Sequence, residues 1–318
     1  MPYILLTRER KVVLILFSAL LAQVPLLYTL AVEREALRES IKSVSYGLAL
    51  PTSIRILSIL LLSVVFGLLP YAIVDYLNRR YLESIDKNLA AFFKGLAEAV
   101  RAGMPFMKAL ESVAKVTPGP LGREMGKVVV RVEFGVPLED ALRDLAERLK
   151  IPSIRRAVTI LITAHESGGR LVEVLDTAAE MQALIRAYEE ERRTQVAPYA
   201  WIVYMAIGLF LVISFILVFA FLEPLSKLMV KATLLGMPQI DVSVYKAILF
   251  ITSALQAILG GLIVGKLRSG SVYAGLLHSI ILALIVIVFF NAIEVYGPAI
   301  SRTLFPTPVT PPSPIPAP

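Results

Sequence analysis

The chain has 318 residues, of which 57% are hydrophobic and 18% charged, and its mean hydropathy is +0.73. Such values lie far above those of soluble domains and indicate a protein that crosses a membrane several times. Cysteine is absent, which excludes a disulfide framework and a thiolate metal site. The net charge of +7 comes from basic residues interleaved with acidic ones, a pattern typical of cytoplasmic membrane flanks and not of a nucleic-acid-binding face. We therefore expect no nucleic-acid partner.

Two apolar runs precede residue 81, and each is about long enough to cross a bilayer core. Residues 12–32 follow a basic segment. Because this run is long and lacks a small-residue cleavage site, it predicts an anchor and not a signal peptide. Residues 54–76 form the second run, and Asn78-Arg79-Arg80 follows it. We predict an N-terminal membrane region, residues 1–80, with spans at 12–32 and 54–76.

Residues 81–196 differ from the rest of the chain because their apolar residues alternate with charges at helical spacing. Residues 89–100 show the pattern, with Lys94 and Glu98 between the apolar positions. Pro152-Ser153 marks the start of a further helix, and Gly168-Gly169 marks its end. Apolar residues then continue at helical spacing from Arg170. We predict an all-α bundle of about six helices between the second and third spans.

One pattern occurs twice inside this region. Gly103-Met104-Pro105-Phe106 and Gly135-Val136-Pro137-Leu138 each lead into a helical run. Glycine accepts the left-handed backbone that closes a helix, and proline at the first helical position lacks an N–H that would be unpaired anyway. We predict a tight turn between helices at each copy, and an internal duplication within one bundle.

Three more apolar runs follow the bundle. We predict spans at 198–222, 247–265 and 276–297 in a C-terminal membrane region, residues 197–304. Residues 305–318 are rich in proline and cannot form a core. If there are five spans, the basic flanks before span 1, after span 2, before span 3 and after span 4 all fall on one side. The positive-inside rule makes that side cytoplasmic. We therefore expect the N-terminus and the bundle in the cytoplasm and the proline-rich tail outside.

The run Gly260-Gly261-Leu262-Ile263-Val264-Gly265-Lys266 fits the spacing of a nucleotide-binding P-loop, but Leu267 replaces the hydroxyl residue that holds magnesium. It also lies in an apolar span and not between a strand and a helix. We interpret Gly261 and Gly265 as small residues that allow two membrane helices to pack closely.

Ionisable residues inside membrane spans are functional candidates by default. Asp75, His278 and Glu294 are the candidates, and all three lie near a predicted span end, which favours snorkelling or helix pairing over a proton relay. His165-Glu166 suggests a metal or acid–base pair, but the sequence has only two histidines. We expect no catalytic site, no metal and no cofactor.

Three runs together resemble the type II secretion system F domain. They are Ala102-Gly103-Met104-Pro105, Gly135-Val136-Pro137-Leu138-Glu139-Asp140-Ala141-Leu142 and Glu166-Ser167-Gly168-Gly169-Arg170-Leu171. This family supplies the inner-membrane platform protein of type II secretion, type IV pilus, Tad pilus and archaellum machines. The stretch from Gly261 to Lys266, with Gly270, Gly275 and His278, resembles the C-terminal membrane part of the short, single-domain Tad-like or archaeal branch.

The resemblance covers roughly residues 86–290 and implies a multi-pass protein of the cell (cytoplasmic or inner) membrane that has no chemistry of its own. The implied partners are a cytoplasmic hexameric secretion ATPase, pilin-like subunits and the lipid bilayer. Many members have two such domains, so a second copy of this chain or a second single-domain homologue is a further implied partner. Many members also have a Gly-Glu pair where this chain has Ala164-His165, so no role is carried over to Glu166.

Two other functions remain open from the residues alone. A transporter or channel would need charges or broken helices at mid-span, and a membrane-anchored signalling scaffold would use the bundle only for docking. For ATPase docking, we predict a surface of clustered charges around the second copy of the repeat, in which exposed charges reverse without loss of folding. Its residues are Arg123, Lys127, Arg143, Glu147, Arg148 and Lys150.

Overall fold

The structure is a computed structural model that describes residues 8–44, 48–226 and 241–304. Within these residues, five helices are long and apolar enough to cross a membrane. The predicted all-α class with five spans is therefore confirmed. By their contacts the residues fall into two compact units. One unit is Ile73–Ala197 with the described part of Met1–Val12, and we call it the bundle unit. The other is Val13–Ala72 with the described part of Pro198–Pro318, and we call it the membrane unit.

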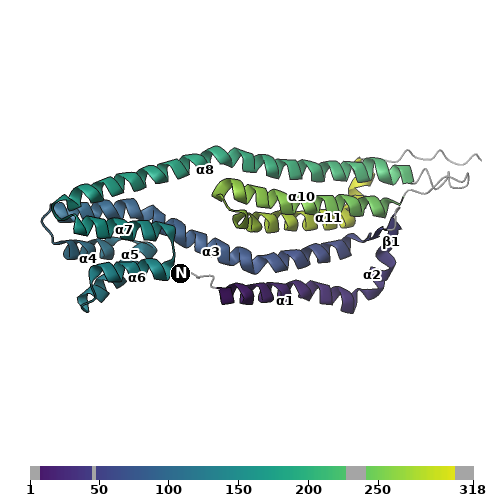
Figure 1. The fold of residues 1–318 in the computed structure, drawn as a ribbon. Coiled ribbons are helices and arrows are strands. Elements are labelled where there is room, and N and C mark those ends of the chain that lie inside the picture. Colours follow the sequence, from purple (N-terminus) through teal and green to yellow (C-terminus); the bar gives the residue numbers. More distant parts are fainter. Residues whose placement is uncertain (1–7, 45–47, 227–240, 305–318) are drawn as a thin grey trace, which may run out of the picture. The chain divides into compact units, whose positions relative to one another are not determined.

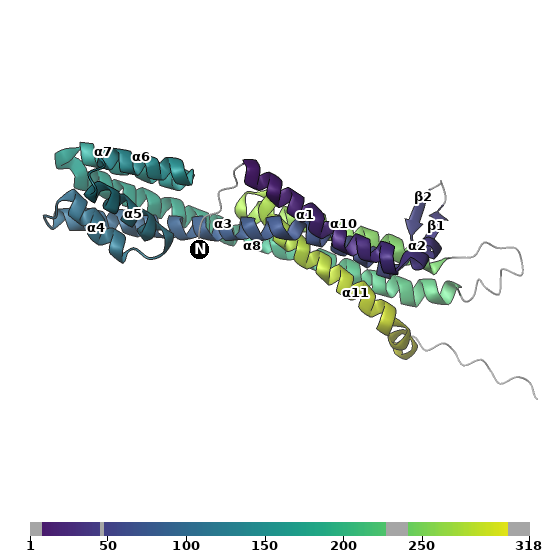
Figure 2. The ribbon, with the colours of Figure 1, turned by 90° about the horizontal axis from the view of Figure 1, so that it is seen from below.

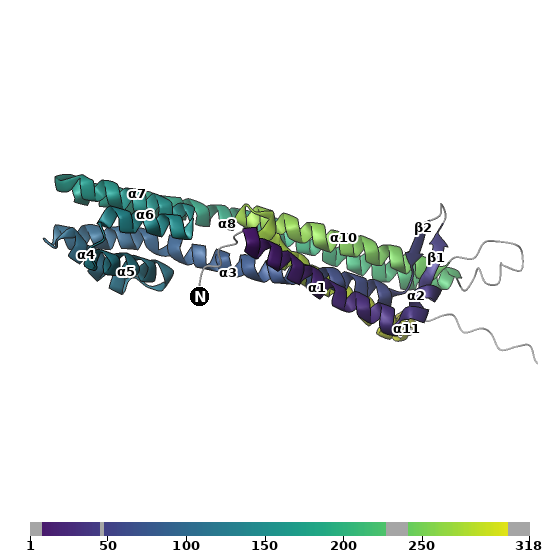
Figure 3. The same cartoon turned by 60° about the horizontal axis from the view of Figure 1, so that its bottom comes forward.

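Six α-helices among the described residues supply the bundle unit (Figure 1). Two are shared with the membrane unit, namely α3 (Ile54–Arg101) and α8 (Leu171–Ile216). The other four are α4 (Phe106–Val116), α5 (Gly119–Glu133), α6 (Leu138–Leu149) and α7 (Pro152–Glu166). A short 3-10 turn, η1 (Gly168–Arg170), precedes α8. Helix α4 lies beside α5 and α6 lies beside α7 (Figure 3).

The core of the bundle unit is built from the apolar stripe of each helix. On α3, Leu89, Phe92 and Leu96 are at most 1% exposed, and Leu110 on α4 and Leu121 on α5 are fully buried. Full burial of one such side chain contributes roughly 1.5–3 kcal/mol relative to exposure. The helical spacing of apolar residues in the sequence therefore places them on the buried faces, as amphipathic helices require.

Both copies of the Gly-x-Pro pattern close a helix with the same backbone geometry. Gly103 and Gly135 have φ of +89° and +90°. At the first turn, Gly103 N–H donates to the Val100 carbonyl and Met104 N–H to the Ala99 carbonyl. Gly135 and Val136 make the equivalent pair of bonds to Val132 and Arg131. This is the Schellman arrangement, which needs a left-handed residue that glycine provides without strain.

The prolines lie one position earlier than the sequence pattern predicts. Pro105 and Pro137 have ψ of 144° and 141°, so each is the N-cap residue and not the first helical residue of α4 or α6. Their carbonyls accept the first helical bonds, from Ala109 and Ala141. The fixed φ of proline also suits this extended cap position.

The membrane unit contains most of α1 (Arg8–Val32), from Val13 onward, together with α10 (Val242–Ser269), α11 (Gly275–Leu304) and parts of α3 and α8. A π-helical segment, η2 (Leu217–Leu222), continues α8, and a 3-10 turn, η4 (Val272–Ala274), precedes α11. Helices α10 and α11 pack against each other (Figure 2). Helix α10 begins five residues before the predicted span because the Asp241 side chain accepts the Ser243 N–H and caps its first turn.

Helices α10 and α11 approach closely at three glycines. A Cβ atom added to Gly261 would lie 2.2 Å from the Ser279 nitrogen, and one added to Gly265 would lie 1.9 Å from the Gly275 nitrogen. One added to Gly275 would lie 2.5 Å from the Gly261 carbonyl oxygen. Small residues at these positions let the two backbones meet, which is how membrane helices gain packing contacts.

The connection between the first two spans has structure that the sequence did not predict. It forms a short helix, α2 (Arg34–Ser40), and a hairpin of β1 (Ile41–Val44) and β2 (Leu48–Pro51), with Ile41 opposite Pro51 and Val44 opposite Leu48. Strands of four residues are too short for an alternating pattern to stand out. The predicted tail, residues 305–318, and the connector at 227–240 lie outside the described residues.

Candidate docking surface of the bundle unit

The structure divides the predicted docking residues between two grooves. Arg123, Lys127 and Arg148 line a groove that runs over α5, with α4 and α6 on its two sides. Arg143 and Glu147 line a different groove, between α6 and α7. The residues that the sequence groups together therefore belong to two surfaces, because α6 turns its successive side chains toward different neighbours.

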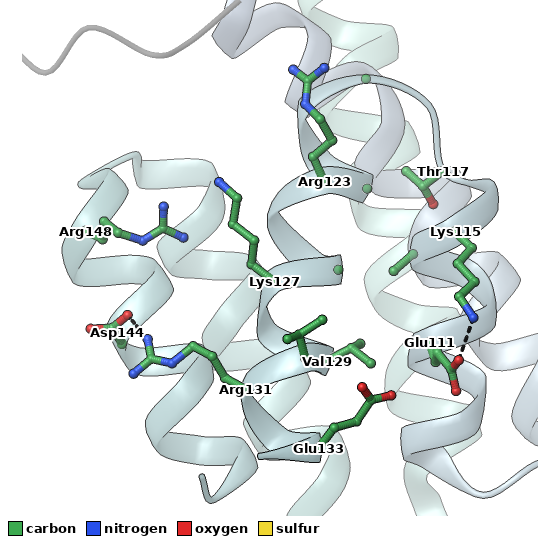
Figure 4. A pocket seen from close by; sticks show the side chains of 15 residues that line it. Glu111, Lys115, Thr117, Arg123, Lys127, Val129, Arg131, Glu133, Asp144 and Arg148 are labelled. Carbon is green, nitrogen blue, oxygen red and sulfur yellow. Dashed lines mark hydrogen bonds and ion pairs between the residues drawn. The ribbon is translucent and has the colours of Figure 1, made fainter. Parts of the chain in front are cut away.

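We call the first surface the α5 groove, and its volume is about 1030 Å³ (Figure 4). Arg123, Lys127 and Arg131 project from α5, and Glu111 and Lys115 lie on α4. Its complete lining is Glu111, Ala114, Lys115, Thr117, Gly119, Gly122, Arg123, Gly126, Lys127, Val129, Val130, Arg131, Glu133, Asp144 and Arg148. Five basic and three acidic side chains among these residues give the groove a positive excess.

A buried carboxylate organises the basic side of this groove. Glu124 is only 7% exposed, and it accepts hydrogen bonds from Lys127 and from Arg148, each at 2.7 Å. The Tyr81 hydroxyl on α3 also hydrogen-bonds to Glu124. A buried charge is tolerated only when it is paired and hydrogen-bonded. Glu124 thus fixes the positions of two cations and joins α5 to α6.

The environment of Glu124 sets its pKa. Burial by itself raises the pKa of this carboxyl group, but the hydrogen bonds from Lys127 and Arg148 outweigh burial and hold the pKa below its usual value. The group therefore stays ionised near neutral pH and keeps its two cations in place. On α4, hydrogen bonds from Lys115 and Lys108 likewise lower the pKa of Glu111.

The expectation that Arg143 and Arg148 can both be reversed without loss of folding stays a prediction, but the surroundings of the two residues differ. Arg148 pairs with the buried Glu124, so a glutamate at this position would place a second carboxylate beside the first. Arg143 instead pairs with Glu139 at an exposed site, where an ion pair contributes little. The sequence did not show this difference because Glu124 and Arg148 lie 24 positions apart.

The second groove has a volume of about 480 Å³ and is lined by residues of α6 and α7, including Arg155, Val158 and Ile162. Lys150, the last of the predicted docking residues, lines neither groove. It caps α6 in the left-handed conformation, with φ of 53°. The backbone of Lys150 therefore ends α6 and begins the turn into α7.

Ser167 lines neither groove, although its hydrogen-bond partner Thr163 lines the second one. Ser167 donates from its hydroxyl and its N–H to the Thr163 carbonyl, and Gly168 has φ of +54°. Glu166 and Gly169 are exposed. The His165 ring stacks 5.1 Å from the Phe106 ring. In the described part of the chain, no group of three His, Cys, Asp or Glu side chains is placed to hold a metal ion.

Two of the three ionisable residues near the predicted span ends have side-chain partners within their own unit. Asp75 accepts from Arg79 at 2.5 Å, one helical turn away. His278 lies 2.6 Å from the Tyr204 hydroxyl, measured from its Nδ1. Glu294 is exposed on α11. These contacts suit residues that join helices or reach the membrane interface.

The α5 groove itself was missed in the sequence, although its glycines are visible there. Gly126 lies within a helix with open space around its missing side chain, since no atom lies within 4 Å of the position of a Cβ. A glycine inside a helix lowers helix stability and usually has a packing or functional reason. Gly126 therefore indicated a groove at this place, but we predicted the docking surface from the clustered charges and not from the glycine.

Comparison with known proteins gives one family and one curated relative. Residues 92–219 match the family model described as type II secretion system (T2SS), protein F. An uncharacterized protein of Methanocaldococcus jannaschii is 23% identical over 232 residues, which is 73% of this chain and 38% of the relative. The chain thus spans well under two thirds of that relative's length. No solved structure matches the chain.

Proposed function

We propose that this protein is the membrane platform of a type IV pilus-like or type II secretion-like assembly machine, because residues 92–219 match the family model of the type II secretion system protein F. The family match is the observation that carries the proposal, and the five apolar helices of a multi-pass membrane protein support it. The platform couples a cytoplasmic hexameric secretion ATPase to the insertion or extraction of pilin-like subunits.

The positive-inside rule supports the orientation. Basic residues flank the apolar spans at Arg10, Arg79, Arg192 and Arg268, and with five spans all four positions fall on the same side of the membrane. That side is the cytoplasm, so the bundle unit faces the ATPase. The N-terminus is then cytoplasmic, and residues 305–318 lie outside.

The bundle unit offers the ATPase a charged surface and no reactive group. Exposed charges of this kind raise the rate of encounter and make binding depend on salt. Arg123 suits this role, since it is exposed and has no ion-pair partner among the described residues. Arg143 is exposed on α6 and adds a second charge. Pilin-like subunits reach the platform through the bilayer, and a second copy of this chain or a homologue completes it.

A binding titration tests the proposal. The full-length protein in lipid nanodiscs is titrated with the secretion ATPase of the same organism at low and high salt. We expect binding at low salt that weakens as salt rises, and a loss on the order of tenfold, about 1.4 kcal/mol, when Arg123 and Arg143 are both changed to Glu. Lys94→Glu, an exposed change on α3, is the matched control with little expected effect.

A genetic test addresses the machine as a whole. Deletion of the gene should abolish assembly of the pilus-like filament or secretion of its substrates, and the wild-type gene should restore it. Normal assembly in the deletion strain, together with no ATPase binding at low salt, would contradict the proposal. Transport of a small solute lost in the deletion strain would favour the transporter alternative.

A further inference from the structure

The α5 groove is hollow beside Gly126, where α5 has no side chain and no atom lies within 4 Å of the position of a Cβ. Gly122 differs, because the backbone of the chain already fills the space beside it and an added Cβ would lie 2.1 Å from the Thr117 carbonyl oxygen. Beside these glycines, Ala114 and Val129 are buried, while Val130 remains 48% exposed. The floor is thus apolar and low, and a second backbone can approach it closely.

The basic side of the groove has more cations than its carboxylates can pair. Glu124 is shared between Lys127 and Arg148, and Arg131 pairs with Asp144. Arg123 has no ion-pair partner among the described residues. On the opposite side, Glu111 is shared between Lys108 and Lys115. With Glu133, which also lines the groove, six basic side chains face four carboxylates, so the groove as a whole keeps a positive excess after its internal pairs are counted.

Two exposed apolar residues lie at the two ends of the helix pair, outside the lining of the groove. Val116 is 76% exposed at the end of α4, and Phe134 is 85% exposed at the end of α5. The groove runs along the whole of α5, which has 15 residues. This strip of surface is therefore about 22 Å long, or roughly four helical turns. A strip of this length fits an extended protein element better than a small molecule.

We propose that the α5 groove seats one acidic amphipathic helix of the secretion ATPase, which deepens the proposed function and rests on it. The small apolar residues of that helix lie over Gly126 and Val130. Its carboxylates face Arg123, Lys127 and Arg148. A helix fits because the α5 groove is formed by helices alone and offers no strand edge, so recognition follows the helix-in-groove mode.

Gly126 gives a steric test that leaves the fold intact. Leucine at this position has space for its Cβ and is a better helix former than glycine, but its side chain fills the groove. We expect Gly126→Leu in the full-length protein in nanodiscs to weaken ATPase binding at least tenfold. Gly126→Ala, which adds one methyl group, should stay within about threefold of the wild type. Hydrogen exchange in α5 that is no faster than in the wild type verifies the fold of both variants.

A second measurement locates the partner element. A photo-reactive phenylalanine at Val130 is activated in the complex of the full-length protein with the ATPase, in nanodiscs that contain anionic lipid, and the cross-linked peptide is identified by mass spectrometry. We expect a helical segment of the ATPase with several Asp or Glu residues. Arg123→Glu should reduce the yield of this product, whereas Lys94→Glu should not.

The outcomes separate this inference from the proposed function. If the wild-type protein does not bind the ATPase at low salt, both fail. If the wild type binds but Gly126→Leu binds equally well, the groove assignment is overturned and the platform function stands. Cross-linking to lipid, or to an ATPase segment without acidic residues, also overturns the groove assignment.

Discussion

Adding one methyl group to Gly135 or to Gly126 should change the stability of the bundle unit in opposite directions. Neither position has an atom within 4 Å of the added Cβ, so the two substitutions do not differ in steric clash with neighbouring residues. They differ in backbone conformation, because Gly135 has φ of +90° and Gly126 lies within α5. The comparison therefore isolates the conformational role of the turn glycine.

The expected magnitudes follow from that difference. An L-residue held in the left-handed region is destabilised by roughly 1–2 kcal/mol, and the two bonds that Gly135 and Val136 make to Val132 and Arg131 hold the turn in this region. Replacing a helix-interior glycine by alanine stabilises by about 0.5–1 kcal/mol. We expect Gly135→Ala to destabilise and Gly126→Ala to stabilise, with a difference of about 2 kcal/mol, or roughly thirtyfold in the opening equilibrium. Gly135→Val should destabilise by about 1–3 kcal/mol.

Hydrogen exchange of the full-length protein in detergent measures this effect without dividing the chain. Peptides from α4, α5 and α6 report the free energy of opening of the bundle unit. Peptides from α10 serve as an internal reference, since they belong to the membrane unit. If Gly135→Ala leaves protection unchanged, or if both substitutions shift it in the same direction, the assignment of Gly135 as an obligatory left-handed cap is refuted. Gly103→Ala should repeat the result for Gly135, because the two turns share one geometry.

Three further predictions concern charge, packing and topology. Glu124→Gln should destabilise the bundle unit by about 1–2 kcal/mol, since it leaves Lys127 and Arg148 without their shared carboxylate. Because the pKa of Glu124 is lowered in the folded protein, the stability from this group is present above its unfolded pKa and is lost as pH falls through the folded pKa. When the pH falls below roughly 4.5, the melting temperature of Glu124→Gln should therefore decrease less than that of the wild type. Gly265→Leu should disrupt the membrane unit, because even its Cβ would lie 1.9 Å from the Gly275 nitrogen, whereas Gly208→Ala, which meets open space, should not. Size-exclusion profiles in detergent compare these two variants. Reporter fusions after Arg80 and Gly270 should report cytoplasm, and fusions after Lys231 and in the tail should report outside; a cytoplasmic tail would mean that a span is misassigned.

Features that depend on local physics were predictable from the amino-acid sequence alone. Five apolar runs of sufficient length predict five membrane helices, because a helix must satisfy its own backbone inside a bilayer. Apolar spacing between residues 89 and 100 predicts the buried face of α3, and Leu89, Phe92 and Leu96 lie on it. The turns at Gly103 and Gly135 were also predictable, since a left-handed residue ends a helix through bonds to residues only three to five positions earlier.

Which charges share a surface depends on the packing of the helices. Lys127 and Arg148 converge on Glu124 because α5 and α6 pack together, and the sequence gives no local sign of a contact between residues 24 positions apart. The same packing separates Arg143 from Arg148 and turns the space beside Gly126 into a groove. Helix periodicity specifies which side of a helix is polar, whereas the identity of the neighbouring helix, and hence the pairing of each charge, depends on how the helices assemble.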